Sequence, residues 1–522
     1  MPLGTNASLC QLSRKLGCSL ILPTLGLLSL LCLDLPASAQ EPGEAAPLLA
    51  AENALVEAIA RGEKSVVSIA RVKKQQADGQ VQFPFGDELN LGFGRVAPDD
   101  PTSPDYIPNE FATGVVIDAR GLILTCYHAL GEDSEYYVTT SERRVYSARI
   151  KGADPRSDLA VLEIEARDLE PIAFGDAETL RKGQIVISLG NPYAIARDGQ
   201  VSASWGIVSN LSRKASPEVD ETGQATGKPT LHHFGTLIQT DARLNLGTSG
   251  GALINLRGEM VGLTTSLAAV AGYEQAAGYA VPVDETFLRV VNMLKQGREV
   301  EYGFLGVQPG NLTLAERPKG ATGMRITNVV PGTPAQREGL RPNDIVTQVN
   351  GRPIHDADGL MLEVGRLPAE GIATLLVHRP NVGVKSFDIV LAKAPIPGKK
   401  IITNPTPAWR GARVDWATVL VNSPDNQARN DSAFQEGCVA VIEVENGSPA
   451  WGAGLRPGML ITHVGGSPVQ TPREFRDAVA KKRGKVDLRI GSESEGRPVL
   501  SIPPAVAPPA PEPAADPANP TK

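Results

Sequence analysis

The sequence predicts a mainly β protein that continues into two small α+β domains, and two patterns carry this prediction. Between Phe111 and Val283, short runs rich in β-branched residues alternate with glycine turns, as in "GIVSNLS", "GTLIQTD" and "GYAVP". Such runs are typical of a barrel or a sandwich. Further along, "VVPGTPAQREGLRPNDIVTQVNGRPI" begins at Val329, and "VENGSPAWGAGLRPGMLITHVGGSPV" begins at Val444. These two copies predict two similar small domains, since a solenoid needs at least three repeats.

The composition is that of a globular protein with several domains. The chain has 522 residues, of which 42% are hydrophobic and 5% aromatic, so it can bury a sizeable core. Its formal net charge of -7 argues against a nucleic-acid partner. Outside the N-terminal segment the cysteines are Cys126 and Cys438, far apart in sequence, and the histidines are scattered. We therefore expect neither a disulfide framework nor a metal or other cofactor.

The N-terminus is typical of an export signal. Arg14 and Lys15 precede the apolar stretch "LGCSLILPTLGLLSLLCLDL", and "ASAQ" follows it, so cleavage is expected after Ala39. An uncleaved membrane anchor is the alternative. No later segment has the apolar length of a membrane span. We expect an exported protein, periplasmic or in the cell envelope, with no stable membrane span after signal cleavage.

The elements around the strand-rich region follow from its periodicity. A helix is expected over Leu48–Ile59, a strand over Ser65–Val72 and a closing helix over Asp284–Gln296. The stretch Lys73–Asn109, rich in Gly, Pro and Asp, predicts a long loop. In the second repeat, Thr471–Glu474 predicts a helix start with a capping box. The apolar stripe of the first helix would consist of Leu48, Leu49, Leu55, Val56 and Ile59.

Ser249 lies in "LGTSGGALINLRGEMVGL", where three glycines surround one hydroxyl. The stretch formally matches the G-x-S-x-G nucleophile elbow, which needs a helix directly after the serine and a histidine later in the chain. The residues after Ser249 instead predict strand, turn and strand. The later histidines all belong to the repeat region, so the elbow interpretation is excluded.

Upstream residues supply a different constellation. His128 ends "LILTCYH" and Asp158 opens "DLAVLEIE", so the order is His, Asp, Ser, as in chymotrypsin-like proteases. A serine hydroxyl needs a general base, and a carboxylate orients the imidazole that serves as that base. Asp154 is the competing carboxylate, but the "DLAVL" context favours Asp158 and places Asp154 in a turn. Cys126 is expected to be a small buried hydrophobic side chain rather than a reactive thiol.

The glycines around Ser249 fit a second requirement of the chemistry. A developing oxyanion needs backbone N–H donors that point inward from a tight turn. Gly247 and Ser249 would supply these donors, while Gly250 and Gly251 leave room for the substrate.

Six ordered blocks resemble the HtrA/Deg serine proteases, and the two repeats resemble the PDZ domains of that family. The blocks are "TGVVIDARGLILTCYHAL", "SDLAVLEI", "LGNPYAI", "GIVSNLSR", "IQTDARLNLGTSGGALINLRGEMVGLTT" and "GYAVP". The resemblance implies a chymotrypsin-like double β-barrel protease domain followed by two small α+β PDZ domains. It also implies a catalytic triad of His128, Asp158 and Ser249, with Gly247 in the oxyanion hole. The chain departs from the family pattern at Leu246, Thr248 and Cys126, where Pro, Asn and Asn are usual.

The resemblance extends to peptide binding. The stretch "YGFLGV" is similar to the loop with which PDZ domains capture a peptide carboxylate; it comprises Tyr302, Gly303, Phe304, Leu305, Gly306 and Val307. In the second copy, "WRGARV", we align Ala412 and Arg413 with Leu305 and Gly306 and expect a less apolar groove.

Two further segments have a family role as one hypothesis and a plain structural role as the other. The polar loop Ser212–His233 either senses PDZ-bound peptide or is a solvated insertion. The phenylalanines of the N-terminal insertion either hold a trimer together or cover their own domain; they are Phe83, Phe85 and Phe93.

The expected function is that of an exported, ATP-independent serine endopeptidase of protein quality control. It would degrade unfolded or damaged proteins, bind peptide C-termini and assemble as a homotrimer or larger oligomer. A PDZ-based chaperone or scaffold with weak or no proteolysis, and a membrane-anchored signalling protease, are the alternatives. The expected divisions are a signal peptide (1–39), an N-terminal helical segment (40–63), the protease domain (64–298), the first PDZ domain (299–394), a Pro-rich linker (395–408), the second PDZ domain (409–503) and a disordered tail (504–522).

Overall fold

A computed structural model describes residues 42–74, 108, 110–191, 199–219, 224–265, 277–313, 323–421, 432–491 and 498–504. The chain divides into a short unit, Met1–Ala51, and a second unit, Glu52–Lys522. The expected signal peptide, the three phenylalanines of the N-terminal insertion and the chain beyond 504 lie outside the described residues. Within the described part, none of the helices has the length and apolar character of a membrane span.

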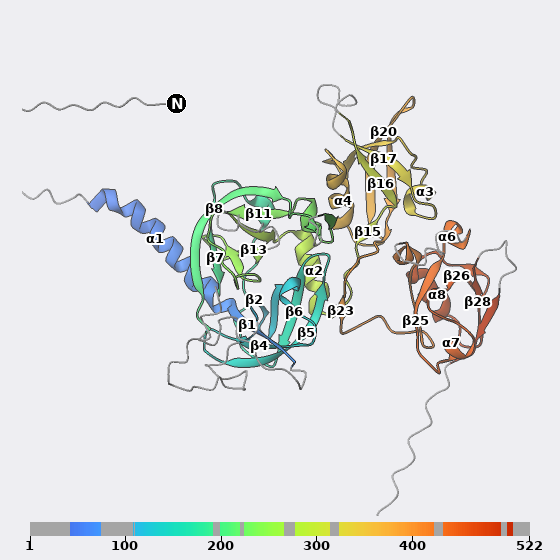
Figure 1. Ribbon diagram of the computed structural model, residues 1–522, viewed down its shortest axis with the longest axis horizontal. Helices are drawn as coiled ribbons and strands as arrows, with labels where there is room; N and C mark the ends of the chain where they lie inside the picture. Colours follow the sequence, from blue (N-terminus) through green and yellow to red (C-terminus); the bar gives the residue numbers. More distant parts are fainter. Residues whose placement is uncertain are drawn as a thin grey trace, which may run out of the picture. The chain divides into compact units, whose positions relative to one another are not determined.

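The first barrel, blue to teal in Figure 1, closes where β5 pairs with β6, after the strand order β5-β4-β1-β2-β3-β6. Its third strand is buried along its whole length because its two faces serve two cores. Ile123 points into this barrel, while Leu124 and Cys126 point into the core shared with the second barrel. The strands are β1 (Val66–Lys73), β2 (Glu110–Asp118), β3 (Leu122–Cys126), β4 (Ser134–Thr139), β5 (Val145–Asp154) and β6 (Leu159–Ile164).

The second barrel, green in Figure 1, is closed in the order β11-β14-β13-β12-β7-β8, with β8 pairing β11. Its interior is filled by aliphatic side chains such as Val208, Ile238 and Leu253. The expected pair of chymotrypsin-like barrels is therefore confirmed. The strands are β7 (Ile185–Gly190), β8 (Ser202–Arg213), β11 (Leu237–Thr240), β12 (Ala252–Ile254), β13 (Met260–Thr265) and β14 (Gly278–Pro282).

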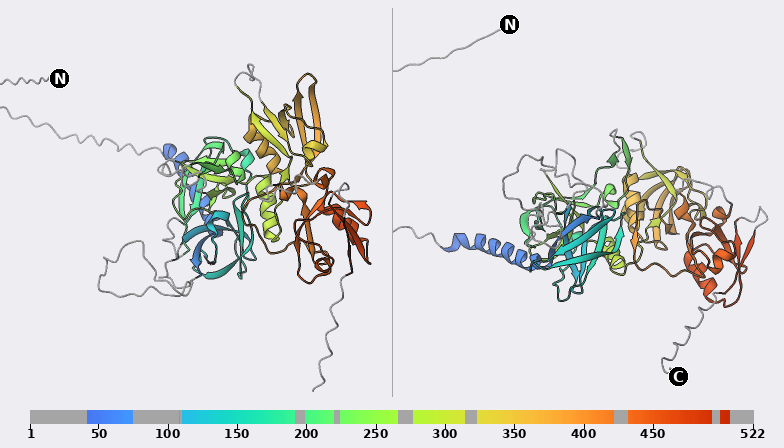
Figure 2. Two further views of the ribbon diagram at one scale, coloured as in Figure 1. Left: turned by 45° about the vertical axis from the view of Figure 1, so that its right-hand side comes forward. Right: turned by 60° about the horizontal axis from the view of Figure 1, so that its bottom comes forward.

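Two helices flank the barrels, and one of them differs from its prediction. Helix α2 (Glu285–Lys295) is capped by Asp284 and buries an apolar face that includes Phe287, Val291 and Leu294; Figure 2 shows it running along the teal barrel. Helix α1 spans Pro42–Gly62 and packs Leu55 and Ile59 against the shared core. Val56 is 58% exposed, however, because it lies about 100° around the helix from Leu55. Leu48 and Leu49 are also exposed, so the predicted stripe was wrong at these three positions.

The two repeats form two modules of the same topology, each with its own core. The first module has the strand order β16-β17-β18-β20-β21, and the second has β24-β25-β26-β28-β29. The first contains β15 (Gly303–Phe304), β16 (Val307–Asn311), β17 (Met324–Val329), α3 (Pro334–Arg337), β18 (Ile345–Val349), β19 (Arg352–Pro353), α4 (Ala357–Arg366), β20 (Ile372–Arg379), β21 (Gly383–Val390) and β22 (Ala392–Lys393). The second contains β24 (Ala412–Trp416), α6 (Ser432–Glu436), β25 (Val439–Val444), α7 (Pro449–Gly452), β26 (Leu460–Val464), β27 (Ser467–Pro468), α8 (Pro472–Ala480), β28 (Val486–Ile490) and β29 (Val499–Ile502).

The structures of the two modules show that the alignment of their first loops was wrong by two residues. Gly306 has a φ of 88°, and its carbonyl accepts the N–H of Val330 at 2.8 Å. Gly411 has a φ of 86°, and its carbonyl accepts the N–H of Glu445 at 2.8 Å. Gly411 therefore corresponds to Gly306, and Arg410 corresponds to Leu305. Glycine is required at both positions because a Cβ would collide with the residue before the proline that starts the next helix. That residue is Thr333 in the first module and Ser448 in the second.

The linker between the modules is partly a strand. Strand β23 (Ile401–Ile402) pairs with β5 and adds a seventh strand to the sheet of the first barrel. Its β-branched pair lies between prolines, which cannot donate to a sheet. On either side, Tyr127 Oη donates to Lys399 O at 3.0 Å and Thr403 Oγ1 donates to Lys151 O at 2.6 Å. Part of this Pro-rich linker is thus docked on the barrel, which its composition does not indicate.

Candidate active site

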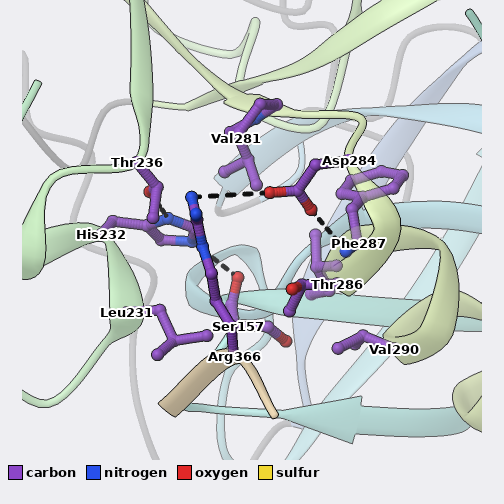
Figure 3. Close-up of a pocket in the computed structure, with 12 residues that line it drawn as sticks. Ser157, Leu231, His232, Thr236, Val281, Asp284, Thr286, Phe287, Val290 and Arg366 are labelled. Atoms are coloured by element: carbon purple, nitrogen blue, oxygen red, sulfur yellow. Dashed lines mark hydrogen bonds and ion pairs between the residues drawn. The ribbon is translucent and has the colours of Figure 1, made fainter. Parts of the chain in front are cut away.

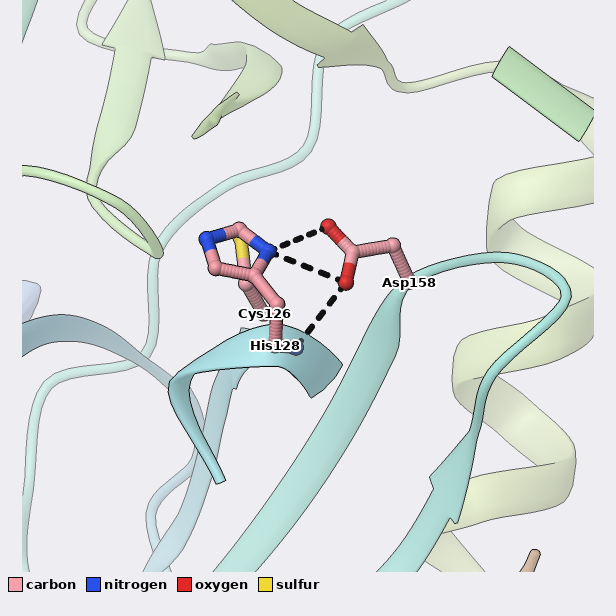
Figure 4. A group of neighbouring side chains, drawn as sticks. All are labelled: Cys126, His128 and Asp158. Carbon is pink, nitrogen blue, oxygen red and sulfur yellow. Dashed lines mark hydrogen bonds and ion pairs between the residues drawn. The ribbon is translucent and has the colours of Figure 1, made fainter. Parts of the chain in front are cut away.

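His128 and Asp158 meet where β3 and the β5–β6 turn end. Strand β3 stops at Cys126, and a single 3-10 turn places His128 beyond it. Its Nδ1 lies 2.8 Å from Asp158 Oδ2 and 3.0 Å from Oδ1 (Figure 4). The backbone N–H of His128 also donates to Asp158 Oδ1 at 3.0 Å. The side chain and the backbone of His128 thus both bind the carboxylate of Asp158, which holds the carboxylate against the ring.

The electrostatics of this pair suit a general base. Burial by itself lowers the pKa of His128, but the charge and hydrogen bond of Asp158 outweigh it and hold the pKa above its ordinary value. A carboxylate can only accept, so Nδ1 carries the proton and Nε2 is left with a lone pair. Asp158 has 2% of its side chain exposed and His128 has 31%, so the ring can reach a substrate while the carboxylate cannot.

Ser249 is the second residue of the later of two consecutive tight turns, which explains the glycines around it. Thr248 N donates to Asn245 O at 3.1 Å, and Gly251 N donates to Thr248 O at 3.0 Å. Gly247 is the third residue of the first turn, with a φ of 90°, and Gly250 is the third residue of the second, with a φ of 86°. A positive φ at this position is the mark of a type II turn and favours glycine.

Threonines of both barrels hold the serine loop. From β2, Thr113 donates its N–H to Ser249 O at 2.9 Å and its hydroxyl to Gly247 O at 2.8 Å. From β13, Thr264 Oγ1 donates to Thr248 O at 2.5 Å. A Cβ at Gly250 would lie 2.1 Å from Thr113 O, so the loop is pressed directly against the first barrel. Ser249 is therefore held at the contact between the two barrels, here called the seam, which also carries His128.

Two of the three departures from the family pattern have clear structural places. Thr248 is buried, donates its hydroxyl to Asn245 O at 2.6 Å and packs against Gly190. It braces the first turn from inside. Leu246 is 76% exposed at the tip of the same turn. Neither side chain takes part in the contact between His128 and Asp158.

The third departure, Cys126, is buried behind the histidine. Its thiol donates to Thr264 O at 3.4 Å, and burial raises the pKa of the thiol well above its ordinary value. Donor atoms of Cys126, His128 and Asp158 lie within 4.8 Å of one another, which is close enough for metal ligands (Figure 4). His128 Nδ1 is already engaged by the carboxylate, however, so the cluster fits a hydrogen-bonded pair backed by a thiol. The expectation of a small buried side chain is confirmed.

Asp154 lies outside this contact and has a different role. It ends β5 and accepts the N–H of Ser157 at 2.8 Å and the hydroxyl of Ser157 at 2.6 Å, as expected of a turn residue. It also accepts the hydroxyl of Tyr302 at 2.5 Å. Tyr302 was expected in the peptide-binding loop, but its side chain is buried in the core of the barrels. Any contact of Tyr302 with a peptide would therefore involve its backbone.

A pocket lies behind Asp158, and its lining includes a residue that sequence reasoning missed (Figure 3). Its wall includes Ser157 and Leu159, the two neighbours of Asp158, together with His232 and Arg366. His232 lies 2.8 Å from Ser157 O through Nε2. In the sequence, His232 is noticeable only as half of an adjacent histidine pair without metal-ligand spacing.

The other residues of the expected peptide loop lie together at the start of the first module. Gly303 and Phe304 form β15, Leu305 is buried in the module core, and Gly306 turns the chain into Val307 of β16. In the second module, Arg410 replaces the buried leucine and donates to Gly484 O and Ile502 O, each at 2.6 Å. The two loops thus share a backbone path but differ in the side chain beneath it.

The polar loop Ser212–His233 contacts the first module. Lys214 and Lys228 lie 2.7 Å and 2.8 Å from the carboxylate of Asp358, in the first turn of α4. The 3-10 turn Leu231–Phe234 follows and packs on the same helix. This loop therefore connects the second barrel to the first module; four of its residues, 220–223, lie outside the described part.

Comparisons with known proteins agree with this arrangement. Residues 112–263 match the trypsin-like peptidase domain family, and residues 325–367 match the PDZ domain family. The chain is 31% identical over 389 residues to a probable periplasmic serine endoprotease DegP-like of Pseudomonas fluorescens, covering 72% of this chain and 76% of the relative. It is 29% identical over 383 residues to the periplasmic serine endoprotease DegP of Salmonella typhimurium, covering 72% and 73%. Among solved structures, the HtrA-type protease AlgW with tripeptide matches with 24% identity and a TM-score of 0.48, covering 66% of this chain and 98% of that one.

Proposed function

The chain belongs to the HtrA/Deg family of serine proteases, and from this premise we propose that His128, Asp158 and Ser249 are its catalytic residues. The observation that carries the proposal is the contact of His128 Nδ1 with the buried carboxylate of Asp158, at the seam to which the Ser249 loop is fastened. Cys126 links the two parts, since its thiol donates to the same threonine, Thr264, that holds the serine loop.

The proposed mechanism is acyl transfer in two steps. His128 Nε2 removes the proton of Ser249 Oγ as this oxygen attacks the scissile carbonyl, and Asp158 stabilises the imidazolium that forms. The N–H groups of Gly247 and Ser249 would donate to the oxyanion of the tetrahedral intermediate. His128 then gives its proton to the leaving amine, and water, activated by the same ring, hydrolyses the acyl-enzyme.

The substrates are proteins, and the finer assignment is part of the proposal. The relatives above are named periplasmic serine endoproteases, which supports an exported, periplasmic enzyme. We propose that it acts in protein quality control without ATP, on unfolded or damaged chains. The loop Tyr302–Val307 of the first PDZ module would take up peptide C-termini through its backbone and the β16 edge. The signal would be cleaved after Ala39, and the active form would be a homotrimer or larger.

The proposed domain limits follow from the elements described above. The first barrel begins one residue after the short turn that follows α1, and α2 ends the double barrel at Lys295. The module strands run from Gly303 to Lys393 and from Ala412 to Ile502. We therefore retain a protease domain over 64–298, PDZ domains over 299–394 and 409–503, and a linker over 395–408.

The test is cleavage of unfolded casein by residues 40–522, beside Ser249→Ala, together with labelling by a fluorophosphonate probe. Cleavage and labelling that both vanish in Ser249→Ala would establish Ser249 as the nucleophile. If the unsubstituted chain shows neither, even with apolar C-terminal peptides added, the peptidase proposal is rejected. Protection of unfolded casein from aggregation by the same sample would then favour a PDZ-based chaperone.

A further inference from the structure

Asp158 has a left-handed backbone conformation, with a φ of 57°. Residues other than glycine enter this region unfavourably, and they stay there only where the surroundings over-determine the backbone. The groups that hold the chain at this turn therefore also set the direction in which Asp158 presents its carboxylate to His128. Two such groups act on the preceding residue, Ser157.

The first group is the carboxylate of Asp154. Its Oδ2 accepts three hydrogen bonds, from Ser157 N at 2.8 Å, from Ser157 Oγ at 2.6 Å and from Tyr302 Oη at 2.5 Å. All three residues are buried, with exposed fractions of 2% for Asp154, 5% for Ser157 and 1% for Tyr302. In a buried site such charge-assisted bonds are short and hold their partners firmly.

The second group is the ring of His232, which holds Ser157 from its carbonyl side (Figure 3). Nε2 lies 2.8 Å from Ser157 O, and Nδ1 lies 2.6 Å from Thr236 Oγ1. A carbonyl only accepts, so the ring proton is on Nε2, and Nδ1 accepts the threonine hydroxyl. Burial lowers the pKa of His232, in agreement with a neutral ring. Ser157 is thus held at its N–H, its side chain and its carbonyl.

Tyr302 is the member of this network that comes from outside the trypsin-like match, which ends at residue 263. It immediately precedes β15, the first strand of the first PDZ module. Its ring packs in the core shared by the barrels, and the guanidinium of Arg289 lies 5.4 Å from the ring centroid. The ring is therefore held by packing, and its hydroxyl donates to Asp154.

We propose that Tyr302 is a positioning residue of the triad, which the start of the first PDZ module supplies to the protease domain. It acts through Asp154 and Ser157 on the backbone of Asp158, and so on the carboxylate that orients His128. The inference rests on the proposed function, because it assigns Tyr302 to the machinery of that same site. Tyr302 itself touches neither substrate nor reacting atoms.

The experiment uses the Tyr302→Phe variant of residues 40–522, assayed with a fluorogenic peptide taken from a casein cleavage site. The substitution removes one oxygen and keeps the ring. We expect kcat to fall about tenfold to a hundredfold with little change in KM, as for a small misplacement of a catalytic group. A folding defect alone would lower the active fraction and the melting temperature but would leave the pH profile in place.

The second readout is the acid limb of kcat/KM, that is, the pH range over which kcat/KM falls toward low pH. A merely structural role of Tyr302 would leave the position of this limb unchanged. Asp158 holds the pKa of His128 above its ordinary value, so a misdirected carboxylate lets that pKa fall. The limb of Tyr302→Phe is therefore expected at lower pH than that of the unsubstituted enzyme. In the described structure the carboxylate of Asp158 and the thiol of Cys126 lie beside His128, and burial keeps the pKa of the thiol well above this range. Burial also raises the pKa of Asp154, which is therefore a further titratable group of this network.

Thr347→Val is the matched control. It also removes one hydroxyl from the first module, where Thr347 Oγ1 donates to Leu376 O at 3.0 Å, but it has no link to Ser157. It is expected to keep both kcat and the acid limb. A second variant, Asp154→Asn, replaces the carboxylate by a neutral amide, which weakens the three bonds that Oδ2 accepts, and should reproduce both changes. Adding Tyr302→Phe to Asp154→Asn should then reduce kcat less than it does alone, because both act through one path.

The outcomes separate this inference from the function on which it rests. If the unsubstituted chain is not labelled and does not cleave, the proposed function fails before Tyr302 is considered. If it cleaves, and Tyr302→Phe retains both its kcat and its acid limb, the positioning role is overturned while the peptidase stands. Additive losses in the double variant would likewise overturn it. Should Tyr302→Phe fail to fold, unchanged kcat and limb in Asp154→Asn would overturn the path through Asp154.

Discussion

The ammonium group of Lys393 lies 2.6 Å from Asp415 Oδ2, although the two residues belong to different PDZ modules. Lys393 ends β22 with 2% of its side chain exposed, and Glu299 and Glu301 also approach it, at 2.9 Å and 3.4 Å. Burial alone would lower the pKa of Lys393, but the three carboxylates outweigh it and raise the pKa above its ordinary value. One buried cation thus joins the start and the end of the first module to the second module.

Replacing Lys393 with methionine is expected to destabilise this junction. Three carboxylates would then face one another without their shared cation, which costs up to about 3 kcal/mol when partners stay partly exposed. Thermal unfolding should show a lower melting temperature, and a protease should cut faster near the module junction. Lys385→Met, at an exposed site of the first module, is the control. Equal melting temperatures for the two variants would contradict the junction role.

Asp158→Asn is expected to abolish most activity and to move its pH dependence. In a Ser-His-Asp protease this change lowers kcat by about 10⁴-fold, because the imidazole loses its tautomer and its charge partner. In the unsubstituted enzyme activity should fall as pH drops through the raised pKa of His128, that is, above 6.5. Residual activity of the variant should persist to lower pH, since burial then lowers that pKa without opposition. An unshifted acid limb would contradict this assignment; exposed Asp388→Asn is the control.

His232 is expected to make the fold sensitive to acid. Its pKa is lowered by burial, against the opposing effect of the Ser157 carbonyl and of Asp158 and Asp284, while His233 lowers it further. The unfolded chain therefore binds a proton that the folded chain does not. Stability is complete above the unfolded pKa and is lost as pH falls from about 6.5 toward the lowered folded pKa.

The check is denaturant unfolding of the unsubstituted chain and of His232→Gln at about pH 8 and about pH 5. The free energy of unfolding should fall more steeply toward low pH in the unsubstituted chain than in the variant. His355→Gln, at an exposed site, should keep the steep dependence. Parallel losses in all three proteins would show that other groups govern the acid sensitivity.

Gly250→Ala is expected to inactivate the enzyme, whereas Gly183→Ala is not. Both glycines have a positive φ, 86° and 88°, so both variants carry a similar backbone strain of about 1 kcal/mol. At Gly250 the new Cβ would meet Thr113 O at 2.1 Å and Thr125 Oγ1 at 2.3 Å, whereas at Gly183 it meets nothing within 4 Å. Fluorophosphonate labelling of Gly250→Ala should therefore be lost. Labelling at the rate of Gly183→Ala would show that the serine loop tolerates displacement.

Much of the fold could be predicted because its signals are local. The barrel strands, helix α2 and the repeat are visible in periodicity, turn residues and self-similarity. Where the signal was weak, the prediction failed by one or two positions. Val56 follows Leu55 directly but lies on another face of α1, and Gly411 was aligned two residues away from its partner Gly306. In each case tertiary packing chose between neighbouring positions that composition alone does not distinguish.

The candidate site also contains residues that the sequence predicts and residues that only the structure reveals. The order of His128, Asp158 and Ser249, with the turn glycines, is local chemistry on three short segments and could be recognised in the chain. The support of Asp158 could not, because Tyr302 is separated from Asp154 by 148 residues and His232 from Ser157 by 75. Hydrogen bonds across such separations leave no periodic trace in a single sequence.

By itself, then, the sequence determined the candidate catalytic residues, most of the strands and helices, and that two similar modules follow. The tertiary structure alone decided that Tyr302 turns inward to Asp154, that the Pro-rich linker places β23 on the first barrel, and that Lys393 joins three carboxylates. The physical reason is the range of the interactions. Turn geometry and side-chain periodicity act over a few residues, whereas burial brings distant polar groups together and requires them to pair.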